Sequence, residues 1–163
     1  MYKATVRVLL RHGLRKLNAG DARFILRLAH PDAVLVFPGD NSYSTMYRPV
    51  VRSAGAHATH RGSEELRGFV ERFIANGVEF VADDILVNGL PHRTRVAVRG
   101  RTRIPGPAGK AMDEYNNRIV AYITITWGRV TSWEDYEDTQ RIADWDAARE
   151  PGDESGSVGT AGM

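Results

Sequence analysis

The chain has 163 residues, of which 42% are hydrophobic and 26% charged, and its formal net charge is +2. These values are typical of one soluble globular domain that can bury a core. The chain has no cysteine, which excludes disulfides, a thiol nucleophile and a cysteine-based metal site. The basic residues are dispersed and the apolar runs are too short to cross a bilayer, so we expect neither nucleic acid nor a membrane as a partner.

The first part of the chain predicts two helices and a strand. Apolar residues recur at helical spacing from Val6 to Leu17, a second short helix follows Asp21, and Ala33–Phe37 has strand character. Arg and Lys lie on the other side of the first helix. Such a helix can lie on a membrane, but the lack of a bulky aromatic face favours the surface of a globular domain. The interrupted apolar residues are unlike a secretory signal, so we expect a cytoplasmic protein.

Residues 38–59 are the least regular part of the predicted domain. Gly39–Ser42 is turn sequence, yet apolar residues such as Tyr43 follow it. Long loops in compact domains are usually functional or disordered. We interpret this segment as a flap near the mouth of a pocket, with an ordinary mobile insertion as the alternative. Ser63 is then expected to cap a helix whose buried stripe runs from Leu66 to Ile74.

The rest of the sequence predicts four strands and a closing helix. The expected strands are Val78–Val87, Thr94–Ile104, Arg118–Trp127 and Val130–Glu137. A helix is expected at Thr139–Arg149. Residues 1–149 should therefore form a single domain. Residues 150–163 are too polar and glycine-rich to fold, and we predict that they are disordered.

The turn at Gly128–Arg129 determines which side chains of the last hairpin share a face. If Trp127 and Val130 flank it, Tyr122 is opposite Asp135, and directly opposed residues share a face. One face would then carry Asn116, Arg118, Tyr122, Trp133 and Asp135. The other face would carry Ile119, Ala121, Ile123 and Ile125.

This hairpin resembles the last hairpin of the NTF2-like superfamily. The match lies in Gly128–Val130 and in the W-x-D-Y-x-D sequence of Trp133–Asp138, with a weaker match at Asn88–Pro91. The superfamily includes SnoaL-like polyketide cyclases, ketosteroid isomerases and limonene-epoxide hydrolases. The resemblance covers about residues 6–145. It implies a cone-shaped, cystatin-like α+β roll, in which a curved, mainly antiparallel sheet packs on helices around a hydrophobic pocket. It implies no single reaction, because the fold hosts many.

The resemblance to limonene-epoxide hydrolases implies that Asp135 is an acid/base in the pocket. We expect Arg99 to contact Asp135 and keep it ionised, although burial beside Trp133 would raise its pKa. The alternative is a structural Asp135 that only pairs with an arginine. Those hydrolases carry R-x-D on the adjacent strand. Here Arg101 stands in place of the second Asp, so hydrolysis by their mechanism is not expected.

Two other chemistries of the superfamily also lack their residues. Steroid-isomerase-like members place an Asp base near the end of the first strand, where this chain has Phe37. Polyketide-cyclase-like members carry an acidic residue in the strand before the last turn, and residues 116–126 contain none. Asp113 and Glu114, at the start of that strand, are the alternative. We expect a small apolar, oxygenated ligand and no cofactor. The predicted substrate-binding residues are Phe37, Tyr43, His60, Asn116, Tyr122 and Trp133.

Two further patterns leave alternatives open. Arg95, Arg99, Arg101 and Arg103 alternate and so face the same way. Pointing inward, they would form an anion site, and pointing outward they would form a solvated stripe. The outward or mixed arrangement is favoured because four buried arginines would need four partners. His57 and His60 lie three apart on a strand and face opposite sides, so we predict no metal site.

We also predict a homodimer that forms through the sheet, as the resemblance implies. The face with Ile119, Ala121, Ile123 and Ile125 would need a partner to cover it. Two functions remain open. The first is an acid/base enzyme, such as an isomerase, cyclase or hydrolase, and the second is a non-catalytic ligand-binding or interaction module. A second buried carboxylate near Asp135 would favour the enzyme, and a pocket filled by its own aromatic side chains would favour the module.

Overall fold

The structure is a computed structural model that describes residues 1–39, 41–45, 57–107 and 112–149. Its helices are α1 (Tyr2–Asn18), α2 (Arg23–Leu28), α3 (Ser42–Thr45), α4 (Gly62–Ala75) and α5 (Thr139–Arg149). Its strands are β1 (Ala29–Pro38), β2 (His57–Arg61), β3 (Glu79–Leu90), β4 (Arg93–Ile104), β5 (Tyr115–Thr126) and β6 (Arg129–Glu137).

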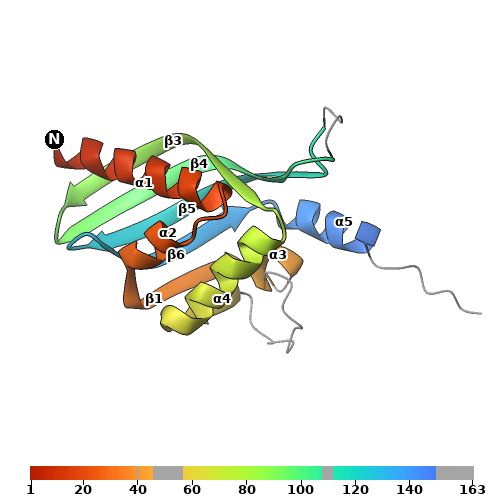
Figure 1. Cartoon of the computed structure of the whole chain (residues 1–163), viewed down its shortest axis with the longest axis horizontal. Coiled ribbons are helices and arrows are strands. Elements are labelled where there is room, and N and C mark those ends of the chain that lie inside the picture. The colour runs from red at the N-terminus through yellow and green to blue at the C-terminus, as the bar shows by residue number, and fades with distance from the viewer. Residues whose placement is uncertain (40, 46–56, 108–111, 150–163) are drawn as a thin grey trace, which may run out of the picture.

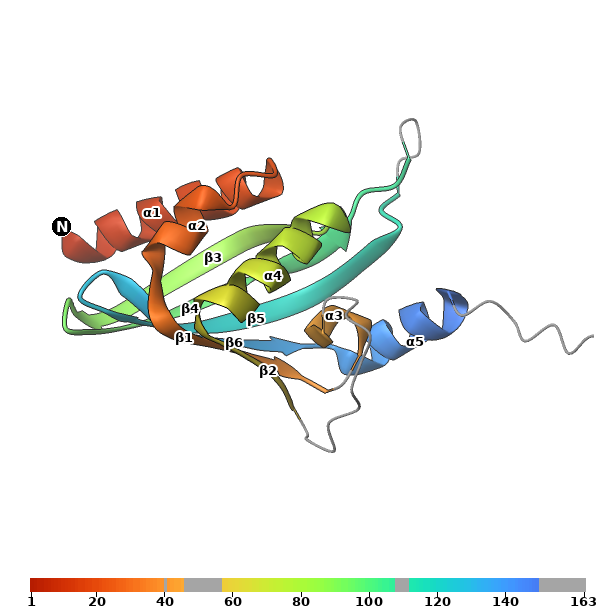
Figure 2. The same ribbon diagram turned by 60° about the horizontal axis from the view of Figure 1, so that its bottom comes forward.

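One curved six-stranded sheet, with the strand order β2-β1-β6-β5-β4-β3, forms the body of the molecule (Figure 1). Strands β1 and β6 pair in parallel, and the other described neighbours pair antiparallel. Helices α1, α2 and α4 cover one face of the sheet, while α5 extends beyond its end (Figures 1 and 2). The predicted α+β roll with a mainly antiparallel sheet is confirmed.

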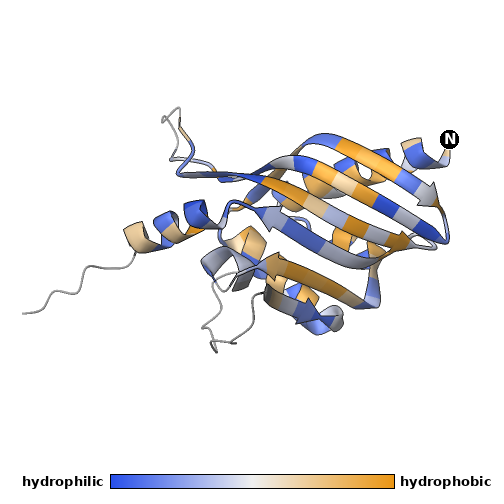
Figure 3. Ribbon diagram, turned by 180° about the vertical axis from the view of Figure 1, so that it is seen from behind, coloured by the Kyte–Doolittle hydropathy of each residue, from blue (hydrophilic) through white to orange (hydrophobic). Residues whose placement is uncertain are grey.

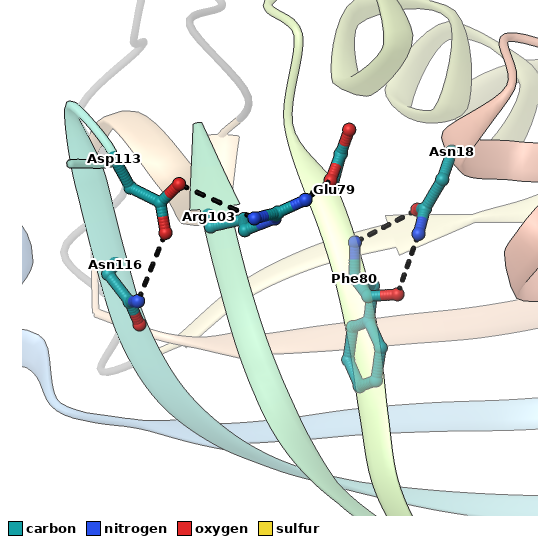
Figure 4. A network of polar contacts seen from close by, with 6 residues as sticks. All are labelled: Asn18, Glu79, Phe80, Arg103, Asp113 and Asn116. Atoms are coloured by element: carbon teal, nitrogen blue, oxygen red, sulfur yellow. Dashed lines mark hydrogen bonds and ion pairs between the residues drawn. The ribbon is translucent and has the colours of Figure 1, made fainter. Parts of the chain in front are cut away.

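The hydrophobic core fills the space between this inner face and the helices. The buried stripes of α1 and α4 consist of Val6, Leu10, Leu14, Leu17, Leu66, Phe69, Val70 and Phe73. The sheet contributes residues such as Phe37, Val96, Val98, Ile119 and Ile123. A polar clamp fixes the end of α1, because the Asn18 side chain binds both the N–H and the carbonyl of Phe80 at 3.0 Å (Figure 4).

Helix α4 begins differently from the prediction. Gly62 is its first residue and Arg61 its N-cap. The hydroxyl of Ser63 donates instead to the carbonyl of Pro31 at 3.3 Å. The carboxylate of Glu65 accepts from the Arg61 N–H at 2.7 Å. The predicted Ser63 cap is therefore wrong, because a glutamate that reaches back satisfies the end of the helix.

The segment predicted as a flap contains α3 and the start of β2. The rest of that prediction, at residue 40 and residues 46–56, lies outside the described residues. The predicted disorder of residues 150–163 also falls outside them.

The hairpin of β5 and β6 contains a β-bulge that the sequence did not reveal. The predicted turn at Gly128–Arg129 is wrong by one residue, because Thr126 pairs with Arg129 and the turn residues are Trp127 and Gly128. The register then changes between Thr124 and Ile125, so that Thr124 pairs with Ser132. A bulge adds one extra residue to one strand, here β6. A shift of one residue turns every later side chain to the opposite face of the sheet.

The bulge changes which side chains of β5 share the inner face with Trp133 and Asp135. Asp135 is opposite Ala121 on the inner face, whereas Tyr122 is opposite Glu134 on the outer face. The prediction that Tyr122 and Asp135 share a face is wrong. The predicted outward placement of the apolar side chains is also wrong, because the core buries Ile119, Ala121, Ile123 and Ile125.

The alternating arginines of β4 point away from the core, as the favoured alternative predicted. They alternate with the buried residues Thr94, Val96, Val98 and Thr102. Arg103 binds Glu79 at 2.7 Å and Asp113 at 3.5 Å (Figure 4). Arg101 reaches Asp83 at 3.4 Å. Ion pairs this exposed contribute about 0–1 kcal/mol each, so the stripe is a solvated surface and not an anion site inside the pocket.

Candidate functional site

An apolar cavity of about 90 Å³ lies between the sheet and the helices. Leu, Ile, Val and Phe side chains of α1, α2 and α4 form half of its wall. Four residues that the sequence suggested for the pocket, Phe37, Tyr43, Trp133 and Asp135, also line it. Asp135 is the only carboxylate among the described lining residues. An acidic group therefore faces an otherwise apolar space.

Asp135 is buried, with 6% of its surface exposed. The indole N–H of Trp133 donates a hydrogen bond to it at 2.5 Å, and the hydroxyl of Tyr43 donates another. Burial raises the pKa of Asp135 to about 7, although both hydrogen bonds favour the ionised form. Near neutral pH this carboxyl group can therefore both accept and release a proton.

Glu137 is a second buried carboxylate, two residues further along the same face of β6. Neither of its oxygens has a hydrogen-bond partner in the described part of the chain. Burial, and then the nearby charge of Asp135, raise the pKa of Glu137 to about 9. Glu137 therefore keeps its proton at neutral pH, while Asp135 is partly ionised. Sequence reasoning missed Glu137, although the i, i+2 spacing from Asp135 was a signal for it.

Tyr43 is held beside Asp135 by contacts on both sides of it in α3. The backbone N–H of Ser42 donates to Asp146 of α5 at 3.0 Å, and its hydroxyl binds the same carboxylate. The carbonyl of Ser44 is 2.8 Å from Nε2 of His60. Burial, and then the charge of Asp135, raise the pKa of Tyr43, so its hydroxyl stays a donor.

His60 was predicted to bind the substrate in the pocket, but the structure gives it a supporting position in the core. It is fully buried and packs against Phe37 and Phe69, with ring centroids 5.7 and 4.9 Å away. It does not line the cavity. Its contact with Ser44 makes it a support for the short helix that carries Tyr43.

Three other predicted site residues lie on the outer face. Arg99 is exposed on β4, and β5 separates β4 from β6. The expected contact between Arg99 and Asp135 is therefore wrong. Asn116 and Tyr122 also point outward from β5, and Asn116 donates to Asp113 at 3.3 Å (Figure 4). The bulge in β6 explains the error for Tyr122, because it places Tyr122 opposite Glu134 and not opposite Asp135.

Within residues 1–39, 41–45, 57–107 and 112–149, no three His, Cys, Asp or Glu side chains are grouped to hold a metal ion. The side chain of His57 is outside this description. No helix in the described ranges has the length and apolar content to cross a membrane.

The model of the SnoaL-like domain family matches residues 10–133, which is most of the chain. The chain belongs to this family. The match ends before Asp135 and Glu137, so it carries no information on the two carboxylates. A search of the curated proteins found no match to this SnoaL-like domain.

Solved structures show the same fold. An NTF2-like protein of unknown function from Burkholderia pseudomallei K96243 is 18% identical, covers 86% of this chain and 95% of its own, and has a TM-score of 0.62. TerC co-crystallised with polyporic acid is 19% identical, with coverages of 83% and 93% and a TM-score of 0.61. A putative polyketide cyclase from Sinorhizobium meliloti is 17% identical, with coverages of 78% and 93% and a TM-score of 0.51. Identities this low establish the fold alone.

Proposed function

We propose that this SnoaL-like domain is an acid/base enzyme that moves a proton on a small apolar, oxygenated molecule in the cavity. The observation that carries the proposal is Asp135, a buried carboxyl in an apolar wall whose pKa is raised to about 7. A group with this pKa is suited to proton transfer at neutral pH. Glu137 is the second buried carboxylate that favours an enzyme over a binding module.

In the proposed reaction the ionised Asp135 removes a proton from a carbon next to a carbonyl group. The electron pair of the broken C–H bond moves toward the carbonyl oxygen and forms an enolate. If the enolate is conjugated with a C=C bond, Asp135 returns the proton to the far carbon of that bond, which gives an isomerisation. If the enolate carbon instead attacks an internal carbonyl carbon, the oxygen of that carbonyl takes the proton from Asp135, which gives a cyclisation. Trp133 and Tyr43 donate to Asp135 and stabilise its ionised form before the proton is taken.

The test is hydrogen–deuterium exchange at the α-carbons of cyclohexanone and the larger 2-tetralone in D₂O, followed by proton NMR. Asp135→Asn keeps the shape and removes the base, so the enzyme-dependent rate should fall roughly 10²–10⁴-fold. Arg99→Gln, on the opposite face of the sheet, is the matched control and should exchange like the wild type. If the wild type does not accelerate exchange of either ketone, or Asp135→Asn exchanges as fast, the proposal fails.

The alternative is a non-catalytic binding or interaction module on the same fold. The size of the cavity favours it, because about 90 Å³ is well below the roughly 300–1,000 Å³ of drug-sized ligand pockets. A module would bind the two ketones without exchanging their protons. The exchange measurement therefore separates the two functions, provided that binding is followed in parallel by chemical-shift changes.

We also propose a homodimer, but through the outer face of the sheet and not through the buried isoleucines. There Leu86 and Tyr136 are 62% and 59% exposed, and Val120 is 40% exposed. Val120 pairs with Tyr136 in neighbouring strands. Hydrophobic and hydrophilic residues alternate along several strands of the sheet (Figure 3). A two-fold pairing would cover its apolar residues and set arginines of one copy against acidic residues of the other. The cytoplasmic location stays a prediction.

A further inference from the structure

The buried side-chain oxygens without a hydrogen-bond partner in the described chain all come from Thr102, Asn117 and Glu137. Thr102 and Asn117 are buried almost completely, with 0% and 2% of their surfaces exposed. Buried polar atoms are nearly always hydrogen-bonded. A group of unpartnered oxygens therefore needs an explanation, above all if its members lie together.

The register of the sheet brings these residues together. They come from β4, β5 and β6, which are neighbours in the sheet (Figure 1). Thr102 pairs directly with Asn117. Glu137 pairs with Ile119, which lies two residues from Asn117 on the same face. Directly opposed side chains have Cβ atoms about 4.5–5.5 Å apart, and diagonal neighbours are about 7–8 Å apart. Four unpartnered oxygens therefore converge on one patch of the inner face.

The patch lies next to the cavity, although Thr102, Asn117 and Glu137 are not among the residues that line it. Glu137 follows Asp135 on the same face of β6, and Asp135 lines the apolar cavity. Asn117 donates its amide N–H to the hydroxyl of Tyr115 at 3.0 Å. Tyr115 and Asp135 are both close enough to Tyr43 to affect its ionisation. The patch therefore lies beyond the polar end of the cavity, on the side of Asp135.

We propose that Thr102, Asn117 and Glu137 form a subsite that binds a hydroxyl group of the ligand whose apolar part occupies the cavity. This inference deepens the proposed function and rests on it for the identity of the cavity as the ligand site. It adds a substrate class, namely an apolar molecule with a hydroxyl or an enol, and it gives Glu137 a binding role.

The hydrogen-bonding capacities of the patch select a hydroxyl. The Asn117 amide nitrogen already donates to Tyr115 and to the carbonyl of Asp138, so only its oxygen remains, and that oxygen needs a donor. A protonated Glu137 and the Thr102 hydroxyl can each donate. A hydroxyl accepts from one neighbour and donates to another. A carbonyl would leave Asn117 unpartnered, and an anion would face its oxygen unfavourably. An ammonium group would have to lose its hydration shell on entering the apolar cavity, which costs free energy.

The test compares toluene, benzyl alcohol and benzylamine, which differ in one substituent, for binding to the full chain by NMR titration. Thr102→Val removes the hydroxyl and keeps the shape. It should weaken benzyl alcohol roughly 2–10-fold, the effect of one hydrogen bond, and leave toluene unchanged. Thr124→Val makes the same substitution on the outer face of β5 and should change neither ligand. The subsite is refuted if Thr102→Val alters both ligands equally or neither of them. It is also refuted if the wild type binds benzylamine more tightly than benzyl alcohol.

Two further variants keep the result independent of folding and of catalysis. Asn117→Leu should weaken benzyl alcohol selectively, but it also removes bonds to Tyr115 and Asp138. If it does not fold, Thr102→Val carries the test, because the Thr102 hydroxyl has no bond to lose in the described chain. Asp135→Asn should abolish ketone exchange and keep the selective effect of Thr102→Val. Selective binding without ketone exchange would refute the catalytic proposal alone, and exchange without selective binding would refute the subsite alone.

Discussion

The indole N–H of Trp133 donates to the carboxylate of Asp135 at 2.5 Å, two residues away on the same face of β6. This bond stabilises the ionised carboxylate, and it opposes the burial that raises the pKa of Asp135 to about 7. The balance between the two effects sets the pH at which Asp135 becomes a base. The bond is therefore the most direct point at which to test the site.

Trp133→Phe keeps an aromatic ring in the wall and removes the donor. The pKa of Asp135 should rise above about 7, because burial then acts with one hydrogen bond fewer against it. A ¹³C NMR titration of the Asp135 carboxyl measures the change. Trp127→Phe, at an exposed turn residue, is the control and should leave the pKa unchanged. An unchanged or lower pKa in Trp133→Phe would show that the bond does not stabilise the ionised form.

The free energy of unfolding should fall as the pH rises from about 4 to about 9. The folded chain raises the pKa of Asp135 from 3.8 to about 7 and that of Glu137 from 4.5 to about 9. Between the unfolded and folded values the folded state binds more protons than the unfolded state. By linkage, stability is greatest below the unfolded values and is lost as the pH rises through the folded values.

Asp135→Asn and Glu137→Gln separate the two contributions. Urea unfolding from pH 4 to 9 should give a flatter curve for Asp135→Asn up to about pH 7 and for Glu137→Gln up to about pH 9. Above pH 7, Asp135→Asn should be no less stable than the wild type, because the described structure shows no cation paired with Asp135. If the plots of unfolding free energy against pH for the two variants ran parallel to that of the wild type, the raised pKa values would be contradicted.

Opposite faces of β5 should respond differently to a negative charge. Ile123 is fully buried, so Ile123→Glu should destabilise the monomer by at least about 4 kcal/mol or prevent folding. Val120 is 40% exposed on the outer face, so Val120→Glu should keep the melting temperature and convert a dimer to a monomer. Circular dichroism and light scattering measure the two effects. The outer-face dimer is wrong if the wild type is monomeric at micromolar concentration.

Gly100 on β4 should not tolerate a side chain. A Cβ there would lie 2.3 Å from the carbonyl oxygen of Val81 on β3, and backbone cannot move as a flexible side chain does. Gly100→Ala should cost about 1–3 kcal/mol in thermal unfolding. Gly68→Ala on α4 is the counterpart, because its Cβ would meet the far end of the Arg72 side chain at 3.0 Å and no backbone. It should stabilise the helix by roughly 0.5–1 kcal/mol. If Gly100→Ala and Gly68→Ala changed the stability equally, the close approach of the backbone at Gly100 would be contradicted.

The sequence by itself predicted the main helices and strands and the resemblance to the superfamily. The helical spacing of Val6–Leu17 and of Leu66–Phe73 defines the buried faces of α1 and α4, because a helix buries one side. The β-branched and aromatic residues of β5 mark a strand for a similar local reason. The motif at Trp133–Asp138 indicated both the superfamily and the candidate Asp135, because all residues of this motif are close together in the chain.

Only the tertiary structure decided which side chains meet. Alternation along a strand shows that Asp135 and Trp133 share a face, but not which residues of β5 they face. That depends on one extra residue in β6, and a bulge has no clear mark in the sequence. The bulge moved Tyr122 away from the cavity. The strand order separated Arg99 from Asp135. The meeting of Thr102, Asn117 and Glu137 is likewise a property of three strands in register, because no local pattern links residues that far apart in the chain.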